Sequence, residues 1–247
     1  MGLSFDFTGR RVLVTGGTSG IGLAVARHFA DSGAEVVATG TKDEAGQYEA
    51  DLSAFDYRAL EITDSPGIDS LAASFDSLDV LVNNAGRSLP GGRSEYEPEV
   101  FEEALAINLT GAFRLSMALH GALSASAAPG GASVVNLASM ASYFGITIVP
   151  GYGAAKAGIV QMTKTLAAAW AADGIRVNAV APGHVVTNMT KVMAESEEMS
   201  RPALERTPMG RWGEAGEISS SVLFLASSGA SFITGQTLAV DGGYSIA

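Results

Sequence analysis

Short runs of β-branched and other apolar residues alternate along this chain with longer stretches that carry apolar residues at helical spacing. Strands that alternate with helices in this way form right-handed crossover units and a parallel sheet. Most of the runs lack a strict apolar–polar alternation, which is typical of strands covered by helices on both faces. The sequence therefore predicts an α/β fold, a doubly wound parallel sheet within a three-layer α/β/α sandwich. The predicted strands are Val12–Thr15, Val36–Thr39, Leu60–Ile62, Val80–Asn83, Ser133–Leu137, Val177–Ala181 and Thr237–Val240.

The first predicted helix follows the first strand and ends near Ser32–Gly33. His28 lies on its apolar face, so we expect this side chain to be packed rather than functional. No repeat, linker or shift in composition marks a second domain, and residues 1–247 are expected to form one domain. Further helices are predicted over about 98–122, 154–172 and 214–227, with a shorter one between residues 64 and 79.

Composition excludes several kinds of function. Lys and Arg number 15 against 26 Asp and Glu, for a formal net charge of -11, and no basic run could follow a phosphate backbone, so nucleic acid is not an expected partner. Absence of cysteine removes disulfides and thiol nucleophiles, and 3 scattered histidines show no ligand spacing, so no metal is expected. No signal peptide or membrane-spanning segment is recognisable, which favours the cytoplasm. Any redox chemistry must come from a bound cofactor.

A glycine-rich turn, TGGTSGIG, follows the first strand at Thr15 and opens the first helix at Gly22. Glycines in such a turn let backbone N–H groups approach a pyrophosphate at the positive end of the helix. A second motif, NNAG, begins at Asn83 directly after the fourth strand, where the strand order of such sheets reverses and ligands bind. Either motif alone is also compatible with an ordinary turn.

Together the two motifs, about 60 residues apart, resemble the paired signatures of the short-chain dehydrogenases/reductases, which have the Rossmann fold. The resemblance runs from about Gly9 to Asp241–Tyr244, nearly the whole chain. It implies hydride transfer between NAD or NADP and a secondary alcohol or ketone. The coenzyme contacts that it implies from the two motifs are Gly16, Thr18, Ser19, Gly20, Ile21, Gly22, Asn84, Ala85 and Gly86.

The residue that ends the second strand bears on the choice between NAD and NADP. A carboxylate there would hydrogen-bond the adenosine ribose and repel a 2′-phosphate. This chain has Gly40, followed by Thr41 and Lys42, which could meet a phosphate as donor and cation. Ser19 stands where NADP-preferring relatives often carry a basic residue, which weakens that argument. The balance favours NADP over NAD.

Two further stretches resemble coenzyme-binding segments of the family. Glu61–Ile62, at the end of the third predicted strand, match an Asp-Val pair beside the adenine, with Asp51–Leu52 as a competing match. Pro182–Gly183 follow the sixth strand and match a PG motif, with Val185 and Thr187 beyond. The resemblance implies that Thr187 binds the carboxamide of the nicotinamide, and a plain helix start at Thr187 is the alternative.

Tyr152 and Lys156 are four residues apart, so on a helix they share one face. A free phenol has a pKa of about 10, too high for efficient proton transfer near neutrality, and an adjacent ammonium favours the phenolate. At about 4 Å and an effective dielectric constant near 20, the attraction is roughly 4 kcal/mol, or about 3 pKa units at most. The predicted pKa of Tyr152 therefore lies near the working pH. Tyr143 has Thr147 four positions later and is expected to pack or to line the substrate site.

The Tyr152–Lys156 pair matches the acid/base motif of the family. Ser139, at the end of a strand, matches its carbonyl-orienting serine, and Asn108 matches the asparagine that completes a proton relay through water to the lysine. The resemblance implies that, in reduction, Ser139 hydrogen-bonds the carbonyl oxygen and Tyr152 protonates it while hydride passes from the nicotinamide to carbon. It also implies that Lys156 holds the nicotinamide ribose.

Residues from about 188 to 212 correspond to the substrate lid of the family, although a helix packed on the core would explain their methionines equally well. The substrate is a small molecule, with 3-oxoacyl thioesters, sugars or polyols, and small cyclic or aromatic ketones as alternatives. A non-catalytic dinucleotide-binding redox sensor is the alternative from another class, although such a protein would be expected to lack the tyrosine or the lysine. Family members are usually homotetramers, so a homo-oligomer, a tetramer or a dimer, is expected.

Overall fold

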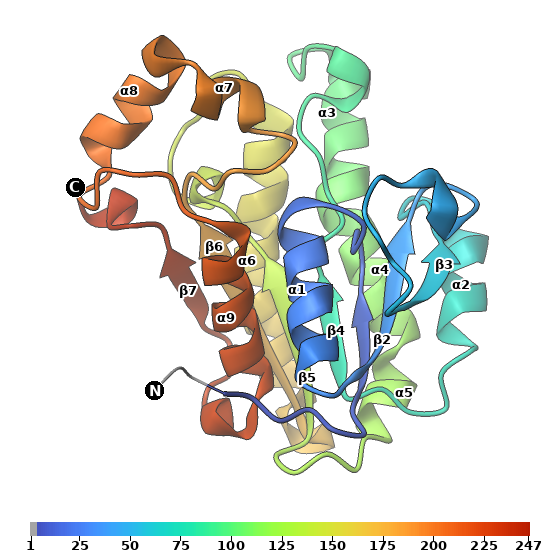
Figure 1. The fold of residues 1–247 in the computed structure, drawn as a ribbon. Coiled ribbons are helices and arrows are strands. Elements are labelled where there is room, and N and C mark those ends of the chain that lie inside the picture. Colours follow the sequence, from blue (N-terminus) through green and yellow to red (C-terminus); the bar gives the residue numbers. More distant parts are fainter. Residues whose placement is uncertain (1–3) are drawn as a thin grey trace.

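The computed structural model describes residues 4–247, which form one sheet of seven parallel strands with helices on both faces (Figure 1). The strand order is β3-β2-β1-β4-β5-β6-β7. β2 and β3 are added on one side of β1 and β4 to β7 on the other, so the strand order reverses between β1 and β4. The predicted doubly wound architecture is confirmed. The strands are β1 Arg11–Val14, β2 Glu35–Gly40, β3 Asp56–Ala59, β4 Val80–Asn83, β5 Ala132–Leu137, β6 Ile175–Pro182 and β7 Thr237–Val240.

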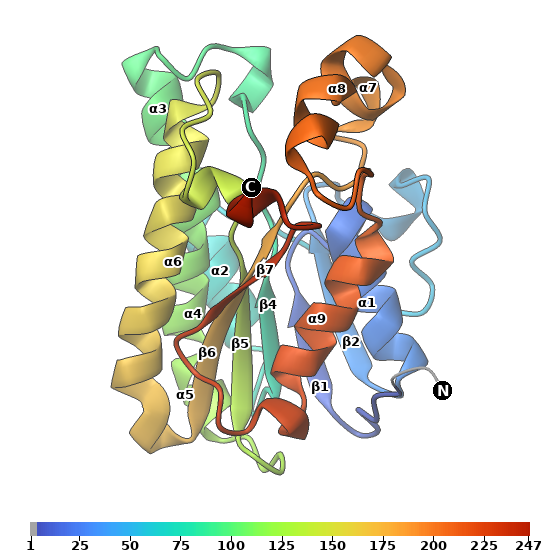
Figure 2. The same ribbon diagram turned by 90° about the vertical axis from the view of Figure 1, so that its left-hand side faces the viewer.

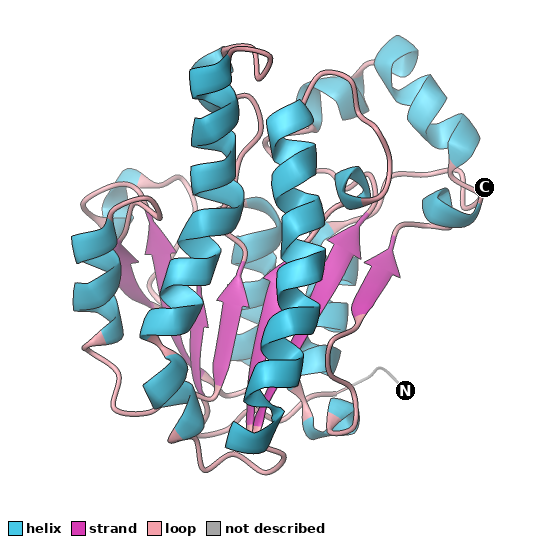
Figure 3. Ribbon diagram, turned by 180° about the vertical axis from the view of Figure 1, so that it is seen from behind, coloured by secondary structure: helices cyan, strands magenta, loops and turns pink. Residues whose placement is uncertain are grey.

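The helices form two layers. One layer contains α1 and α9, which pack against each other on the same face of the sheet (Figure 2). The opposite layer contains α2, α4 and α6, and from behind the run α3–α5 and the long α6 cross the sheet side by side (Figure 3). The helices are α1 Gly20–Asp31, α2 Ser65–Ala72, α3 Pro98–Leu105, α4 Gly111–Ala118, α5 His120–Ser124, α6 Pro150–Trp170, α7 Lys191–Glu195, α8 Glu197–Arg206 and α9 Ala215–Ala226.

The predicted third strand is wrong in position. Leu60–Ile62 lie beyond the carboxyl end of β3, and the ladder with β2 is formed by Asp56–Ala59 instead. β3 is an edge strand whose polar residues face solvent, so it lacks the apolar run that marks the inner strands. Leu60 and Ile62 are buried, but they pack at the end of the sheet rather than within it.

Two predicted helices also differ from the structure. The single helix expected over 98–122 is a run in which a π-helical turn, Ala106–Thr110, separates α3 from α4, and α5 follows. The helix expected from residue 154 begins at Pro150, because proline is favoured at the first position of a helix. His28 is packed as expected, with its Nδ1 3.0 Å from the Ser219 hydroxyl oxygen of α9.

The carboxyl ends of the strands all lie at one edge of the sheet, and α7 and α8 stand beyond that edge (Figure 1). Within residues 4–247, the structure contains no helix with the length and apolar character needed to cross a membrane. Buried apolar residues lie on both faces of the sheet and leave polar side chains to gather at its carboxyl edge. The candidate functional residues therefore lie at that edge.

Candidate active site

The glycine-rich turn connects β1 to α1 at the carboxyl edge of the sheet. It is fixed to β2 because the Gly16 amide donates to the Thr39 hydroxyl at 3.3 Å and the Gly17 amide donates to the Thr39 carbonyl at 2.9 Å. Ser19 precedes α1 in an extended conformation, and its side chain does not cap the helix. The first turn of α1 also lacks an acidic residue, so its positive end is open to an anion.

The two glycine-containing motifs meet in space. The Asn84 amide nitrogen donates to the carbonyl oxygens of Thr15 and Gly16 at 2.9 and 3.1 Å, and the Thr15 hydroxyl accepts from the backbone amides of Asn84 and Ala85 at 3.0 Å each. A β-carbon on Gly22 would collide with the Gly16 carbonyl and the Asn84 side chain. Asn84 thus holds the shape of the glycine turn through its side-chain amide.

A tyrosine that sequence reasoning missed lies at the end of β2. A β-carbon on Gly40 would collide with the Tyr48 hydroxyl and would lie 2.7 Å from a methyl carbon of Thr18. The Tyr48 oxygen accepts from the Lys42 backbone amide at 2.9 Å, and the Lys42 ammonium lies 4.7 Å from the centre of the Tyr48 ring. Tyr48 follows Gly40 in an irregular segment, so no periodicity pointed to it.

Burial alone would raise the pKa of Tyr48, but hydrogen bonds outweigh burial and lower it. They involve the Tyr57 side chain, the Lys42 backbone and the hydroxyls of Thr41 and Thr18. Gly40, Thr41 and Lys42, predicted from the sequence, therefore gather with Tyr48 and Thr18 around one polar corner. That corner contains hydroxyl groups and an ammonium. It has no carboxylate at the end of β2, the position from which one would hydrogen-bond the adenosine ribose.

The segment after β6 lies over the glycine turn. The Cβ of Thr187 is 3.3 Å from the position that a β-carbon on Gly20 would take. The Thr187 amide donates to the Thr190 hydroxyl at 3.0 Å, and Thr190 rather than Thr187 precedes the first residue of α7. Thr187 is therefore not the cap of a helix, and it lies beside the turn that opens α1.

The remaining predicted coenzyme residues lie beyond the carboxyl ends of β6 and β3. Pro182 ends β6, and Gly183 packs tightly against the backbone of Asp241. Val185 is buried and bridges to Gly213. At the opposite end of the strand order, Glu61 is exposed just beyond the edge strand β3, and Ile62 is buried against Gly111 of α4.

Tyr152 and Lys156 lie in the first two turns of α6, on one face, as predicted. Lys156 is buried, its Nζ donates to the Leu137 carbonyl at 2.6 Å, and it lies 5.6 Å from the centre of the Tyr152 ring. Burial lowers the pKa of Lys156 to about 8. The Leu137 carbonyl, at the end of β5, thus positions the ammonium beside the phenol.

The predicted lowering of the Tyr152 pKa is wrong for this structure. Burial, the largest cause, raises the pKa of the phenol, the Ser139 hydroxyl lowers it, and the negative charge of Glu95 raises it further. The Lys156 ammonium lies 5.6 Å from the centre of the Tyr152 ring, and it is not among the groups that shift the pKa of the phenol. Tyr152 is therefore a protonated phenol near neutral pH.

Ser139 and Asn108 complete the group that the sequence singled out. Ser139 follows β5 in an extended conformation, and its hydroxyl accepts from the Ala141 amide at 3.1 Å. Asn108 lies in the π-helical turn, a feature often found at functional sites. Its amide donates to the carbonyls of Ala104 and Arg87 at 2.9 and 2.8 Å, and its oxygen accepts from the Arg87 amide at 3.0 Å.

Asn108 and Lys156 converge on Gly86, the last residue of the NNAG motif. A β-carbon on Gly86 would lie 2.6 Å from the Asn108 side-chain oxygen and 3.6 Å from the Lys156 Nζ. The four predicted catalytic residues are thus placed around the carboxyl ends of β4 and β5. Tyr143, the other tyrosine that follows Ser139, is 49% exposed.

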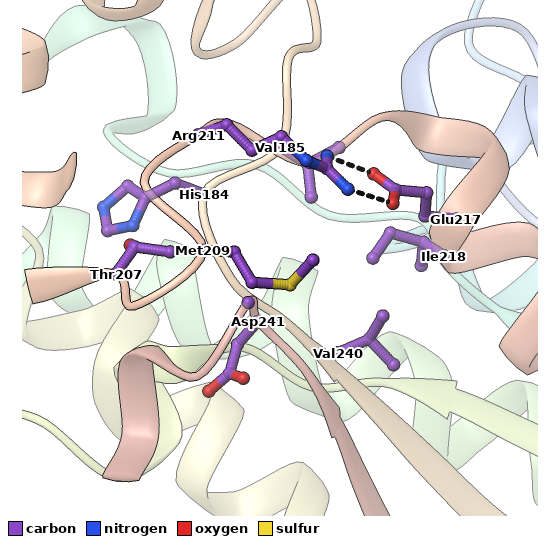
Figure 4. A pocket seen from close by; sticks show the side chains of 11 residues that line it. His184, Val185, Thr207, Met209, Arg211, Glu217, Ile218, Val240 and Asp241 are labelled. Atoms are coloured by element: carbon purple, nitrogen blue, oxygen red, sulfur yellow. Dashed lines mark hydrogen bonds and ion pairs between the residues drawn. The ribbon is translucent and has the colours of Figure 1, made fainter. Parts of the chain in front are cut away.

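A cavity of about 110 Å³ lies between the base of the α7–α8 segment, the ends of β6 and β7, and α9 (Figure 4). An ion pair between Arg211 and Glu217, with N···O 2.7 Å, borders it. His184, also in its lining, packs edge-on against Trp212 and Tyr244, with ring centres 5.4 and 5.0 Å apart, and burial lowers its pKa. Ser139, Tyr152 and Lys156 do not line this cavity.

This arrangement combines an open helix N-terminus, a glycine-rich turn, and a half-buried Tyr152 beside the buried Lys156 and the Ser139 hydroxyl. The first two features fit a pyrophosphate, and the third can donate a proton to an oxygen atom. The described residues therefore fit a dinucleotide at the carboxyl edge of the sheet with a proton donor beside it.

Comparisons with known proteins agree with this assignment. A family model described as "Enoyl-(Acyl carrier protein) reductase" matches residues 16–245. Galactitol 2-dehydrogenase (L-tagatose-forming) of Cereibacter sphaeroides is 38% identical over 255 residues, covering 98% of this chain and 97% of that protein. 2-Dehydro-3-deoxy-D-gluconate 5-dehydrogenase of Bacillus subtilis (strain 168) is 35% identical over 248 residues, covering 98% and 96%.

Among solved structures, a gluconate 5-dehydrogenase from Burkholderia cenocepacia J2315 in complex with NADP and tartrate superposes with a TM-score of 0.87 at 30% identity, covering 98% of both chains. Family model, relatives and solved structure all extend over nearly the full length of the chain. This chain belongs to the short-chain dehydrogenase/reductase family, and it is an oxidoreductase that acts on CH–OH groups with a nicotinamide coenzyme.

Proposed function

We propose that this chain is an NADP-dependent dehydrogenase/reductase that interconverts a secondary hydroxyl group and a ketone on a polyol, a sugar or a sugar acid. The observation that carries the proposal is the convergence of Asn108, Ser139, Tyr152 and Lys156 around the NNAG motif, which is itself hydrogen-bonded to the glycine turn of α1. The redox-sensor alternative has no comparable support, because a sensor does not need a proton donor beside a buried lysine at this edge.

The coenzyme would be held along the carboxyl edge of the sheet. The amides at the start of α1 and the turn Gly16–Gly22 would bind the pyrophosphate, and Thr187 with the Pro182–Val185 segment would lie over the nicotinamide end. The polar corner around Tyr48 favours NADP, because Thr18, Lys42 and Tyr48 offer donors and a cation to a 2′-phosphate. The Asn84 side chain holds the turn that would bind the pyrophosphate, and Asn84 itself stays a predicted coenzyme contact.

Proton transfer would be performed by Tyr152. In the reductive direction, Ser139 donates a hydrogen bond to the carbonyl oxygen, and the Tyr152 phenol then protonates that oxygen. The bound coenzyme supplies the hydride. A raised pKa keeps Tyr152 protonated and ready to act as the acid, whereas oxidation requires a phenolate, which a positive charge near the ring would stabilise.

Lys156 contributes a buried cation at pH values below about 8. It would hold the nicotinamide ribose and, from 5.6 Å, stabilise negative charge on the phenol. Asn108 fixes the backbone of Arg87 next to this cation, and we propose that it orders the water that resupplies a proton to Lys156. Residues from about 188 to 212, which contain α7 and α8, would close over the substrate as a lid.

The polyol and sugar-acid class is supported by the names of the relatives, which act on galactitol and 2-dehydro-3-deoxy-D-gluconate, and by the gluconate 5-dehydrogenase structure. A test is the change in nicotinamide absorbance with NADPH, NADH and their oxidised forms across polyols, ketoses, keto-gluconates, a 3-oxoacyl thioester and a cyclic amino ketone. Turnover of a member of the first three groups with NADP(H) is expected. Tight coenzyme binding without turnover on the whole panel would favour the sensor instead.

A further inference from the structure

Glu95 is a buried carboxylate beside the proposed acid, outside every motif that the sequence pointed to. Glu95 is 1% exposed and lies in the loop between β4 and α3. No Lys, Arg or His nitrogen within residues 4–247 lies within ion-pair distance of its oxygens. The nearby Arg87 and Arg93 both pair with Glu103 of α3. A buried carboxylate without a cation is costly unless hydrogen bonds compensate it.

Two backbone amides provide that compensation. Oε2 of Glu95 accepts from the Tyr152 amide at 2.8 Å, and Oε1 accepts from the Leu89 amide at 2.8 Å. The Tyr152 amide belongs to the first turn of α6, whose own cap residue, Val149, offers no side-chain acceptor. Glu95 therefore caps α6 from another segment, at the end where a negative charge is favourable.

The other amide that Glu95 holds belongs to a strained loop. Leu89 has a φ of 47°, the one positive φ at a non-glycine position in the described part of the chain, a conformation that a β-carbon disfavours. The same loop begins at Arg87, whose amide and carbonyl are held by Asn108. The loop is thus fixed at one end by Asn108 and near its middle by Glu95.

Small residues allow this contact. A β-carbon on Gly151 would lie 2.9 Å from the Ala104 methyl group of α3 and 3.3 Å from Oε2 of Glu95. Glycine at 151 therefore lets the carboxylate and α3 approach the first turn of α6. The turn that carries the proposed acid is bound on one side by Glu95.

We infer that Glu95 is a positioning residue for Tyr152, fixing the first turn of α6, and with it the direction of the phenol, to the loop that follows the NNAG motif. The inference rests on the proposed role of Tyr152. It assigns to Glu95 a second effect, because its negative charge raises the pKa of the phenol and so keeps the proton on the acid. The other charged group near the phenol is Lys156 on α6, 5.6 Å from the ring centre, whereas Arg87 and Arg93 both pair with Glu103 of α3.

The test is the pH profile of kcat/KM for ketone reduction in wild type, Glu95→Gln and Glu95→Asp. Glu95→Gln keeps the shape but removes the charge, and its amide group can accept from only one of the two N–H groups. We expect kcat to fall by about tenfold or more, because a misplaced acid loses near-attack geometry, while the KM for the coenzyme stays within about twofold. The loss of activity at high pH should move to lower pH, because the phenol loses its proton more readily.

Glu95→Asp keeps the charge but cannot reach both amides. It should lower kcat and leave the pH profile in place, and it remains informative if Glu95→Gln does not fold. Glu103→Gln is the matched control, since it removes a carboxylate from the same region without touching Tyr152, and its pH profile should equal that of wild type. A titration of phenolate absorbance in the coenzyme-free protein, with Tyr152→Phe as reference, reads the pKa of Tyr152 without turnover.

Wild-type kcat in Glu95→Asp, or an unshifted pH profile and phenol pKa in folded Glu95→Gln, would overturn the inference. Tyr152→Phe separates this failure from failure of the proposed function. If Tyr152→Phe retains turnover, the acid has been misassigned; if it is inactive while both Glu95 variants behave as wild type, only the role of Glu95 is wrong.

Discussion

At the scale of single residues, the site depends on side chains from irregular segments that contact the ends of β2 and α6. Tyr48 brings its hydroxyl to the space over Gly40, where a side chain at the end of β2 would otherwise lie. Glu95 caps a helix to which it does not belong. β2 ends in a glycine without a side chain, and α6 has no cap of its own. In both cases a residue from an irregular segment supplies the missing polar group, and its position in the sequence does not reveal this contact.

Replacing Tyr48 with Phe should weaken binding of a 2′-phosphate. The hydroxyl is a hydrogen-bond donor and acceptor beside Thr18 and Lys42, and a hydrogen bond to a charged group contributes about 1.5–3 kcal/mol. Calorimetry with 2′,5′-ADP should show affinity falling by about tenfold or more, while 5′-ADP is affected by less than about twofold.

Tyr57→Phe is the matched control for Tyr48→Phe. Tyr57 packs against Tyr48 with ring centres 5.7 Å apart, and its hydroxyl donates to the Lys42 carbonyl. It leaves the Tyr48 hydroxyl in place, so the preference for 2′,5′-ADP should persist. Unchanged or tighter binding of 2′,5′-ADP by Tyr48→Phe would mean that the tyrosine fills the pocket of the phosphate, and the preference for NADP would have to be abandoned.

At the scale of elements, α9 is fixed to the sheet by a buried arginine. Arg176 of β6 is 7% exposed, and its guanidinium donates to the carbonyls of Leu225, Ala226 and Ser227 at 2.7, 3.2 and 3.2 Å. These carbonyls end α9, where no further helical turn can satisfy them. A cation is favoured at this negative end of the helix.

Arg176→Met should therefore destabilise the fold. Buried carbonyls would lose a charged donor, and we expect the free energy of unfolding measured with urea to fall by about 2–4 kcal/mol. Arg201→Met removes an exposed i,i+4 pair of α8, with N···O 3.9 Å, and should cost less than about 0.5 kcal/mol. Equal losses in the two variants would contradict the role given to Arg176.

Elements with a clear apolar periodicity were predictable from the sequence. Features that depend on contacts between distant residues, or on an exposed polar edge, were not. Inner strands such as β4 and the apolar face of α1 follow from apolar patterns, and the four-residue spacing of Tyr152 and Lys156 correctly predicted their shared face on α6. β3 was misplaced because an exposed edge strand has a polar sequence. The raised pKa of Tyr152 was missed because it depends on burial and on Glu95, which lies 57 residues away in the chain.

At the scale of the whole molecule, one open seven-stranded sheet with a helical layer on each face supports the edge where the proposed catalytic and coenzyme-binding residues lie. The inner strands and both helical layers are apolar, whereas the glycine turn, the NNAG motif, Ser139 and the start of α6 lie at the carboxyl ends of β1, β4 and β5. The segment with α7 and α8 stands above this edge (Figure 1). Assembly into a homo-oligomer remains a prediction, for which light scattering in solution is the measurement.

The role of Tyr152 is the central claim, and turnover by two tyrosine variants tests it most directly. Tyr152→Phe removes the phenol from the buried group, whereas Tyr143→Phe removes a phenol that is 49% exposed and has no lysine four residues later. With the best polyol or ketose substrate and NADP(H), Tyr152→Phe should reduce kcat by about 100-fold or more with coenzyme affinity intact, and Tyr143→Phe should keep most of the activity. Normal turnover by Tyr152→Phe, or loss of turnover only in Tyr143→Phe, would contradict the account.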